Sequence, residues 1–234
     1  MKNSIIVKLE IDGKMKKKVL VLAGMPSSGK STLAEGISEA LGGAAVLKFD
    51  DYFEFLQGWP KDMRKWIDEG AEVNDWKNAQ MVDDLKKLLK GKTIVYPITG
   101  KTVQPRSFII MEDPSGRERR EIMDYIDYLL YIDIPNEISL MRSLERWLYS
   151  EMVKEDGSKV KVREEQPAKL LEHMMKYLRM FVEYSRDLYV VVCERVKRDA
   201  DVILDGLKPT KELVKEVLEF LEENNKELEM EGTL

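Results

Sequence analysis

The sequence predicts an α/β fold in which helices cover both faces of a mostly parallel β-sheet. The first observation is that apolar, strand-like segments alternate with amphipathic helical segments along the chain; the strands are expected at 18–23, 44–49, 107–111, 128–132 and 200–204. Continuous apolar runs of this kind are typical of parallel strands that are buried on both faces. The second observation is a glycine-rich loop between the first of these strands and the helix that follows.

That loop, residues 24–31, reads GMPSSGKS and fits the pattern G-x-x-x-x-G-K-[ST] completely. Its backbone N–H groups and the positive end of the next helix are suited to hold nucleotide phosphates. Lys30 is expected to reach the β- and γ-phosphates, and Ser31 to ligate Mg²⁺. The pattern predicts a P-loop NTPase fold, a three-layer α/β/α sandwich that binds a nucleotide. The residues expected to contact the nucleotide are Gly24, Met25, Pro26, Ser27, Ser28, Gly29, Lys30, Ser31 and Thr32.

The remaining segments complete a single domain over residues 1–234. A strand from Ile5 to Ile11 ends in Asp12-Gly13, which favours an N-terminal β-hairpin, and a further strand is expected at 93–96, before Pro97. Pro135 opens one helix and Pro167 opens a longer one. We expect an acceptor-binding insertion at about 52–80 and a helical lid at about 142–167.

Composition excludes several classes of function. The 234 residues carry a net charge of −5, which gives no reason to expect nucleic acid as a partner. No run of 18 apolar residues is present, so no membrane span is expected, and the first seven residues lack the apolar stretch of a signal peptide. The single cysteine, Cys193, is typical of a reducing compartment, and a cytoplasmic location is expected. His173 has no Cys or acidic partner at metal-ligand spacing.

A phosphate loop alone does not separate a switch, a motor and a kinase. A kinase of small hydroxyl compounds also needs a carboxylate beside the acceptor, an acidic group near Mg²⁺ and a basic lid. Asp50, at the end of the strand after the loop helix, is the candidate acceptor carboxylate, with Asp51 as the alternative. Either Glu112 or Asp113, at the end of another strand, is expected to support Mg²⁺.

Two arginines and several aromatic residues extend the candidate site. Arg142 and Arg146 lie four residues apart, on one face of the helix opened by Pro135, and are expected to bind phosphate oxygens as the lid closes. Trp59, Trp66 and Trp76 lie in the irregular region and the segment after it, where one of them is a candidate for lining an acceptor pocket and core packing is the alternative. The residues expected to contact the acceptor are Asp50, Tyr52, Trp59, Asp75 and Trp76.

The order of these parts resembles the uridine kinase and phosphoribulokinase-like family of P-loop kinases. The similarity covers about residues 18–208, through the loop at 24–32, the segments at 49–53, 74–76 and 110–112, the arginines at 142 and 146, and the strand at 199–203. It implies Asp50 as the base, Glu112 as the Mg²⁺ support and Arg142 and Arg146 as lid arginines. Three positions depart from the family pattern: Thr99-Gly100 replaces Tyr-Asp, Ser139 replaces an arginine, and extra residues surround Asp156-Gly157.

The sequence therefore predicts an ATP- and Mg²⁺-dependent kinase that phosphorylates a hydroxyl group of a small molecule. A nucleoside is the first candidate acceptor, and a sugar, a polyol or a hydroxy acid is the alternative. A regulatory NTPase switch stays open because Asp113-Pro114-Ser115-Gly116 matches D-x-x-G, and so does a nucleotide-binding scaffold. The sequence also leaves open a homo-oligomer.

Overall fold

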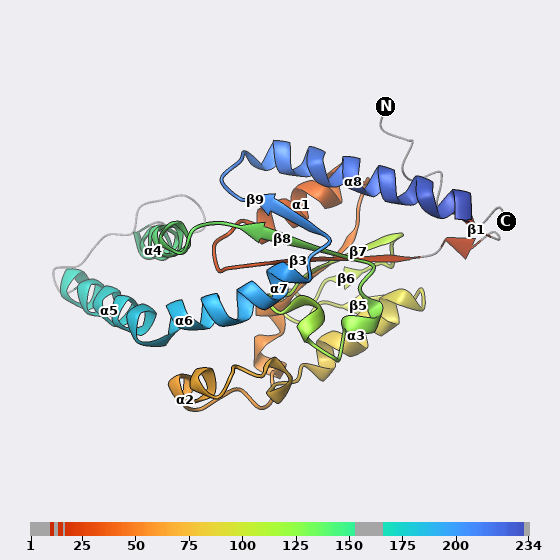
Figure 1. Cartoon of the computed structure of the whole chain (residues 1–234). Helices are drawn as coiled ribbons and strands as arrows, with labels where there is room; N and C mark the ends of the chain where they lie inside the picture. Colours follow the sequence, from red (N-terminus) through yellow and green to blue (C-terminus); the bar gives the residue numbers. More distant parts are fainter. Residues whose placement is uncertain (1–9, 12–13, 16, 153–165, 232–234) are drawn as a thin grey trace.

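A five-stranded parallel β-sheet forms the centre of the molecule (Figure 1). The computed structural model describes residues 10–11, 14–15, 17–152 and 166–231. The strands lie in the order β4-β7-β3-β8-β9, and every pairing between neighbours is parallel. Their bounds are β3 (Lys18–Gly24), β4 (Ala45–Lys48), β7 (Phe108–Glu112), β8 (Tyr128–Asp133) and β9 (Val202–Asp205). The predicted parallel sheet is confirmed.

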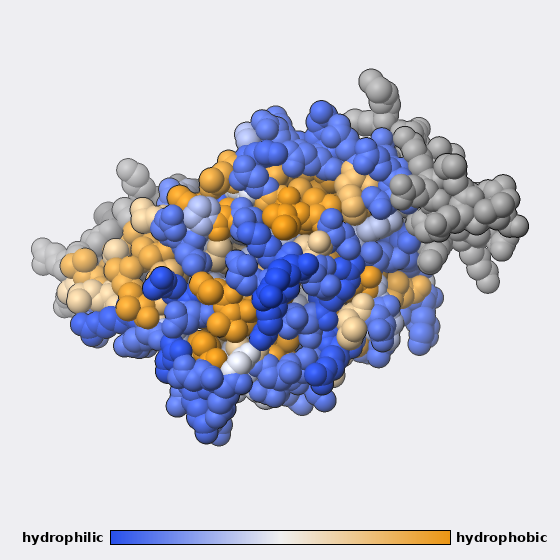
Figure 2. Space-filling view, in the orientation of Figure 1, coloured by the Kyte–Doolittle hydropathy of each residue, from blue (hydrophilic) through white to orange (hydrophobic). Residues whose placement is uncertain are grey.

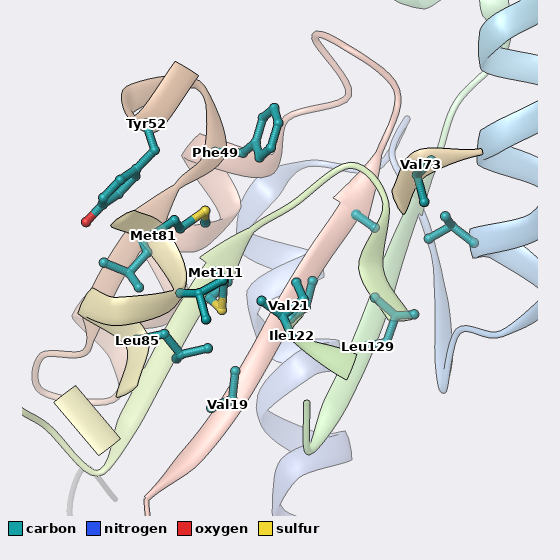
Figure 3. Close-up of a cluster of buried hydrophobic side chains, with 14 of the residues drawn as sticks. Val19, Val21, Phe49, Tyr52, Val73, Met81, Leu85, Met111, Ile122 and Leu129 are labelled. Carbon is teal, nitrogen blue, oxygen red and sulfur yellow. The ribbon is translucent and has the colours of Figure 1, made fainter. Parts of the chain in front are cut away.

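Helices cover both faces of this sheet, because side chains along each strand alternate between two separate apolar clusters. On β3, Leu20 and Leu22 pack with α1 (Lys30–Ala40) and α8 (Thr210–Glu231). Val19 and Val21 point to the opposite face, where they join side chains of α3 (Ala79–Leu89) such as Met81 (Figure 3). The predicted three-layer α/β/α sandwich is therefore confirmed.

The remaining helical elements include α7 (Glu194–Arg198), whose Val196 packs in the same buried cluster as Val19 and Val21 of β3. The others are the 3-10 helix η2 (Phe49–Phe55), α2 (Met63–Asp68), η3 (Val73–Asp75), η4 (Gly116–Glu118), η5 (Met123–Tyr125), α4 (Asn136–Met152), α5 (Gln166–Met180) and α6 (Arg186–Leu188). Two π-helical segments, η6 (Phe181–Ser185) and η7 (Tyr189–Cys193), join α5, α6 and α7 into one nearly continuous rod. In Figure 1 the arrowheads of β8 and β9 point toward α4 and α5, so these helices lie at the carboxyl end of the sheet.

Two antiparallel hairpins lie outside the main sheet. Strand β1 (Glu10–Ile11) pairs with β2 (Lys14–Met15), as the N-terminal hairpin signal predicts, whereas residues 5–9 and 12–13 lie outside the described part. The strand predicted at 93–96 does not join the parallel sheet: β5 (Ile94–Val95) pairs instead with β6 (Thr102–Val103). Pro97 has no N–H to donate, and the Gly100 N–H bonds to the Tyr96 carbonyl at 2.8 Å, so the chain turns back on itself. Within the described residues, no helix is long and apolar enough to cross a membrane.

Candidate active site

The phosphate loop connects β3 to α1 in the geometry that its sequence predicts. Gly29 caps the N-terminus of α1 with a φ of 103°, and a Cβ there would project into open space above the helix end. Gly24 has a φ of 143°, and a Cβ at this position would lie 2.6 Å from the Ile132 carbonyl oxygen. Lys30 Nζ donates to the carbonyl oxygens of Gly24 at 2.9 Å and Met25 at 2.8 Å, so the loop wraps around the ammonium group.

Ser31 and Glu112 meet beside this loop, although 81 positions separate them in the sequence. The Ser31 hydroxyl donates to Glu112 Oε2 at 2.7 Å, because β7 places its last residue next to the start of α1. Glu112 is only 6% exposed, and burial raises the pKa of its carboxyl group. Its other oxygen, Oε1, lies 3.9 Å from Lys48 Nζ and has no hydrogen-bond partner among the described residues. A hydroxyl oxygen and a buried carboxylate oxygen without a hydrogen-bond partner are ligands that suit Mg²⁺ and its water shell.

Asp50 and Asp51 both line the cavity above the loop, but their surroundings differ. The Asp51 carboxylate accepts a hydrogen bond of 2.7 Å from the Tyr96 hydroxyl, which in turn accepts from the Lys48 N–H at 3.1 Å. Asp50 is exposed to the cavity. Burial lowers the pKa of Lys30, and the nearby carboxylates of Glu112 and Asp50 oppose that effect. The geometry therefore separates the two candidates and favours Asp50 as the carboxylate that faces a bound molecule.

Asp113 lies next to Glu112 in sequence but turns away from the cavity. Its carboxylate forms a buried ion pair with Arg119 and accepts the Ser115 N–H at 3.0 Å. Arg119 also donates to Glu121 at 3.0 Å. The Asp113–Gly116 match to D-x-x-G thus contains a structural aspartate, and its carboxylate is not available to a nucleotide-sensing switch.

One cavity of about 780 Å³ joins the phosphate loop to an aromatic wall. On the side of η2 and α2, this wall contains Phe53, Trp59, Met63 and Trp76. The rings of Trp59 and Trp76 stack in parallel with centroids 4.4 Å apart, and Phe53 packs edge-on against Trp59 at 5.2 Å. Trp59 is 39% exposed and Phe53 49%, so both rings keep surface available to a ligand.

A second wall of the cavity comes from the helical rod formed by α5, η6, α6 and η7. Its lining residues are Met180, Tyr184, Ser185, Leu188, Tyr189, Val192 and Cys193. Five of these seven belong to the two π-helical segments, which widen a helix locally and occur frequently at functional sites. These residues are not identifiable as site residues from sequence, because helical spacing predicts only an apolar face and not what that face covers.

Helix α4 rests on the phosphate loop through two serines. The Ser139 hydroxyl donates to the Pro26 carbonyl at 2.7 Å, and the hydroxyls of Ser143 and Ser27 lie 2.9 Å apart. Arg142 and Arg146 both line the cavity, and Arg142 donates from both terminal nitrogens to the Gly206 carbonyl at 3.2 Å. The predicted lid at 142–167 is described only in part: residues 153–165, including Asp156-Gly157, lie outside the described residues.

Several residues selected from sequence lie away from the cavity. Tyr52 is fully buried and donates to Asp84 at 3.1 Å, while the Asp75 carboxylate accepts from Trp66 Nε1 at 3.1 Å. Neither Tyr52 nor Asp75 lines the cavity. The ring of His173 packs against Trp147 with centroids 6.1 Å apart. Among the described residues, no group of three or more His, Cys, Asp or Glu side chains is arranged to hold a metal ion by protein ligands alone.

Two curated proteins show what the chain resembles. The uridine kinase of Borrelia hermsii (strain HS1 / DAH) is 27% identical over 140 residues, which cover 55% of this chain and 66% of that relative. The uridine kinase of Staphylococcus aureus (strain JH9) is 27% identical over 145 residues, covering 55% and 67%. The chain is similar to uridine kinases. It nevertheless spans only 66% of the length of the Borrelia relative.

Solved structures and family models add less. Shikimate kinase from Aquifex aeolicus vf5 is 19% identical and superposes with a TM-score of 0.44, covering 88% of this chain and 97% of that one. No family model matches the chain. The resemblance to uridine kinases that the sequence motifs indicated is therefore confirmed by the curated relatives rather than by the superposition.

Proposed function

We propose that the protein is an ATP-dependent kinase that transfers the γ-phosphoryl group to a hydroxyl group of a small molecule. The observation that carries this proposal is the meeting of Lys30, the Ser31–Glu112 pair and Asp50 in one cavity. Phosphoryl transfer depends mainly on positioning and on stabilising charge, and these residues offer both. The similarity to uridine kinases supports the same class of reaction.

Each residue of the site has a definite part in this proposal. The N–H groups of the loop and the N-terminus of α1 bind the phosphates, and Lys30 and Arg146 place positive charge on the transferring group. Ser31 and Glu112 hold Mg²⁺, which when bound neutralises charge on the phosphate oxygens. Asp50 orients the acceptor hydroxyl and takes its proton.

A nucleoside is the acceptor that we propose first. The curated relatives are uridine kinases, and the partly exposed ring of Trp59 gives a flat surface for a base. The charged lining residues belong to the phosphate loop, to the ends of β4 and β7, to the start of η2 and to α4, whereas Phe53, Trp59, Met63, Trp76 and the helical rod supply none among the described residues. A hydroxy acid would therefore lack a cation for its carboxylate at the aromatic end. Sugars and polyols remain the alternative acceptors, because their hydroxyls require no charged partner.

The first experiment measures ADP release from Mg-ATP with pooled nucleosides, sugars, polyols and hydroxy acids. Lys30→Ala serves as the blank, because its side chain carries the charge that the loop encloses. Stimulation of the wild-type protein by one pool supports the kinase proposal and identifies the acceptor class. No stimulation by any pool, with nucleotide binding retained, contradicts it.

A matched pair of variants then tests the base. Asp50→Asn should abolish transfer and leave ATP binding unchanged, whereas Asp51→Asn should keep most of the turnover, because Asp51 is bonded to Tyr96. Near-normal turnover in Asp50→Asn, together with loss in Asp51→Asn, would move the role to Asp51.

A further inference from the structure

The outer face of α5 and η6 exposes a stripe of large apolar side chains. Leu171, Met175, Leu178 and Val182 are 59%, 53%, 38% and 76% exposed. Figure 2 shows apolar residues gathered over α5, at the left end of the molecule in the orientation of Figure 1. Single exposed apolar residues are ordinary on a protein surface, whereas a contiguous row of them marks an interaction site. We refer to these four residues as the α5 stripe.

The α5 stripe is separate from the wall of the proposed active site. The cavity is lined from the same helical rod by Met180 and Tyr184, and none of the four stripe residues takes part in its lining. The stripe residues follow one another at intervals of four, three and four positions. This is the spacing of the seam by which two helices pack in a coiled coil, and it predicts a helix as the partner surface.

Charged residues beside the α5 stripe indicate which helix can pack against it. Glu172 and Arg179 are seven residues apart and flank the stripe on the same side, each one position after a leucine of the stripe. Among the described residues, neither forms a hydrogen bond or an ion pair, although both lie on the protein surface. In an antiparallel pair of identical helices related by a two-fold axis, Glu172 of each copy lies beside Arg179 of the other. In a parallel pair the two copies of each charged residue lie on opposite sides of the seam, so no Glu172–Arg179 pair forms.

We propose that the α5 stripe is a two-fold interface between two copies of this chain, with their α5 helices packed antiparallel. A self-complementary surface is what a two-fold dimer requires, since the same patch must fit itself. Four apolar side chains from each copy form the centre, and two Glu172–Arg179 pairs form the rim. This inference does not depend on the proposed kinase activity.

Sedimentation velocity of the full chain over a wide range of concentrations tests the interface. The wild-type protein should change from monomer to dimer as concentration rises. Met175→Glu should weaken dimerisation at least about tenfold, because it places a charge in the apolar centre. Met175→Gln is the milder second variant. Met175 is 53% exposed in the monomer, so circular dichroism should show unchanged helix content in both variants.

A charge-swap series fixes the orientation of the two helices. Glu172→Arg and Arg179→Glu should each weaken the dimer, and the double variant should restore it. Lys211→Glu, an equally exposed charge reversal on α8, is the matched control and should change nothing. A protein that stays monomeric at every concentration overturns the interface, and so does a dimer that tolerates Met175→Glu. Failure of the double swap to restore association overturns the antiparallel arrangement.

Discussion

Replacing Arg119 by methionine tests a buried ion pair that supports two parts of the proposed active site at once. Arg119 pairs with Asp113, the residue directly after Glu112, and its guanidinium lies over the ring of Phe49 with the carbon 5.5 Å from the ring centroid. Phe49 directly precedes Asp50. The pair therefore joins the end of β7, which carries the proposed magnesium carboxylate, to the start of η2, which carries the proposed base.

The size of the effect follows from burial. The Arg119 side chain is 1% exposed and that of Asp113 is 0% exposed, so methionine would leave a carboxylate charge inside the protein with only the Ser115 N–H at 3.0 Å. Removing one partner of a buried ion pair costs about 3–5 kcal/mol of unfolding free energy. At about 2–4 °C per kcal/mol for a protein of this size, Tm should fall by roughly 6–20 °C.

Thermal and urea unfolding measure this loss, and two further variants make the result specific. Arg119→Met combined with Asp113→Asn should recover about half of the lost stability or more, because the amide keeps an acceptor for Ser115 without a buried charge. Arg120→Met removes an exposed neighbour whose pair with Glu72 spans 3.8 Å and should change stability by about 0.5 kcal/mol or less. A loss below about 1 kcal/mol in Arg119→Met, or no recovery in the double variant, would refute the reasoning.

Three more predictions follow from single contacts. Burial raises the pKa of Glu112, so between the unfolded and folded pKa values the folded protein keeps a proton that the unfolded chain releases. The contribution of Glu112 to the unfolding free energy should therefore fall as pH rises from its pKa in the unfolded chain through its pKa in the folded protein. Urea titrations at several pH values should show that Glu112→Gln removes this slope. Ser139→Ala loses the hydrogen bond to Pro26 and should weaken nucleotide binding in calorimetric titrations; unchanged affinity would show that α4 does not hold the loop. Tyr52→Phe should cost only about 0.5–1.5 kcal/mol in urea unfolding, because Gln80 and Lys87 still bind Asp84.

The phosphate end of the site could be predicted because it depends on the ends of parallel strands. In such a sheet the carboxyl ends of the strands meet along one edge. The position of a polar residue directly after an apolar run therefore predicts that its side chain lies at that edge. Glu112 and Asp50 were placed this way, and the structure brings both into the cavity with Lys30. The preference for Glu112 over Asp113 came from the family resemblance, because consecutive strand residues point to opposite faces and a one-residue shift would exchange them.

The acceptor end could not be predicted to the same extent. Tyr52 and Asp75 lie in short 3-10 helices, whose side-chain directions depend on the packing around them rather than on a sequence period. The strand at 93–96 has the composition of a sheet strand but pairs locally, since Pro97 and the turn at Gly100 return the chain to β6. The two π-helical segments shift the helical phase between α5 and α7, so a regular period misassigns which side chains enter the cavity.

This difference explains why a reaction class is easier to infer here than an acceptor. The groups that would handle phosphate come from a loop and from strand ends, where sequence pattern and position in the fold are tightly linked. The groups that would recognise the acceptor are aromatic and aliphatic side chains on η2, on the loops beside α2 and on the helical rod, and they fit more than one kind of molecule. The departure at Thr99-Gly100 lies in the hairpin turn beyond Tyr96, whose hydroxyl holds Asp51 rather than a ligand. In the proposed function, the acceptor therefore contacts the Trp59 wall and the π-helical segments that also line the cavity. Variants that change acceptor preference without changing ATP use should be sought there.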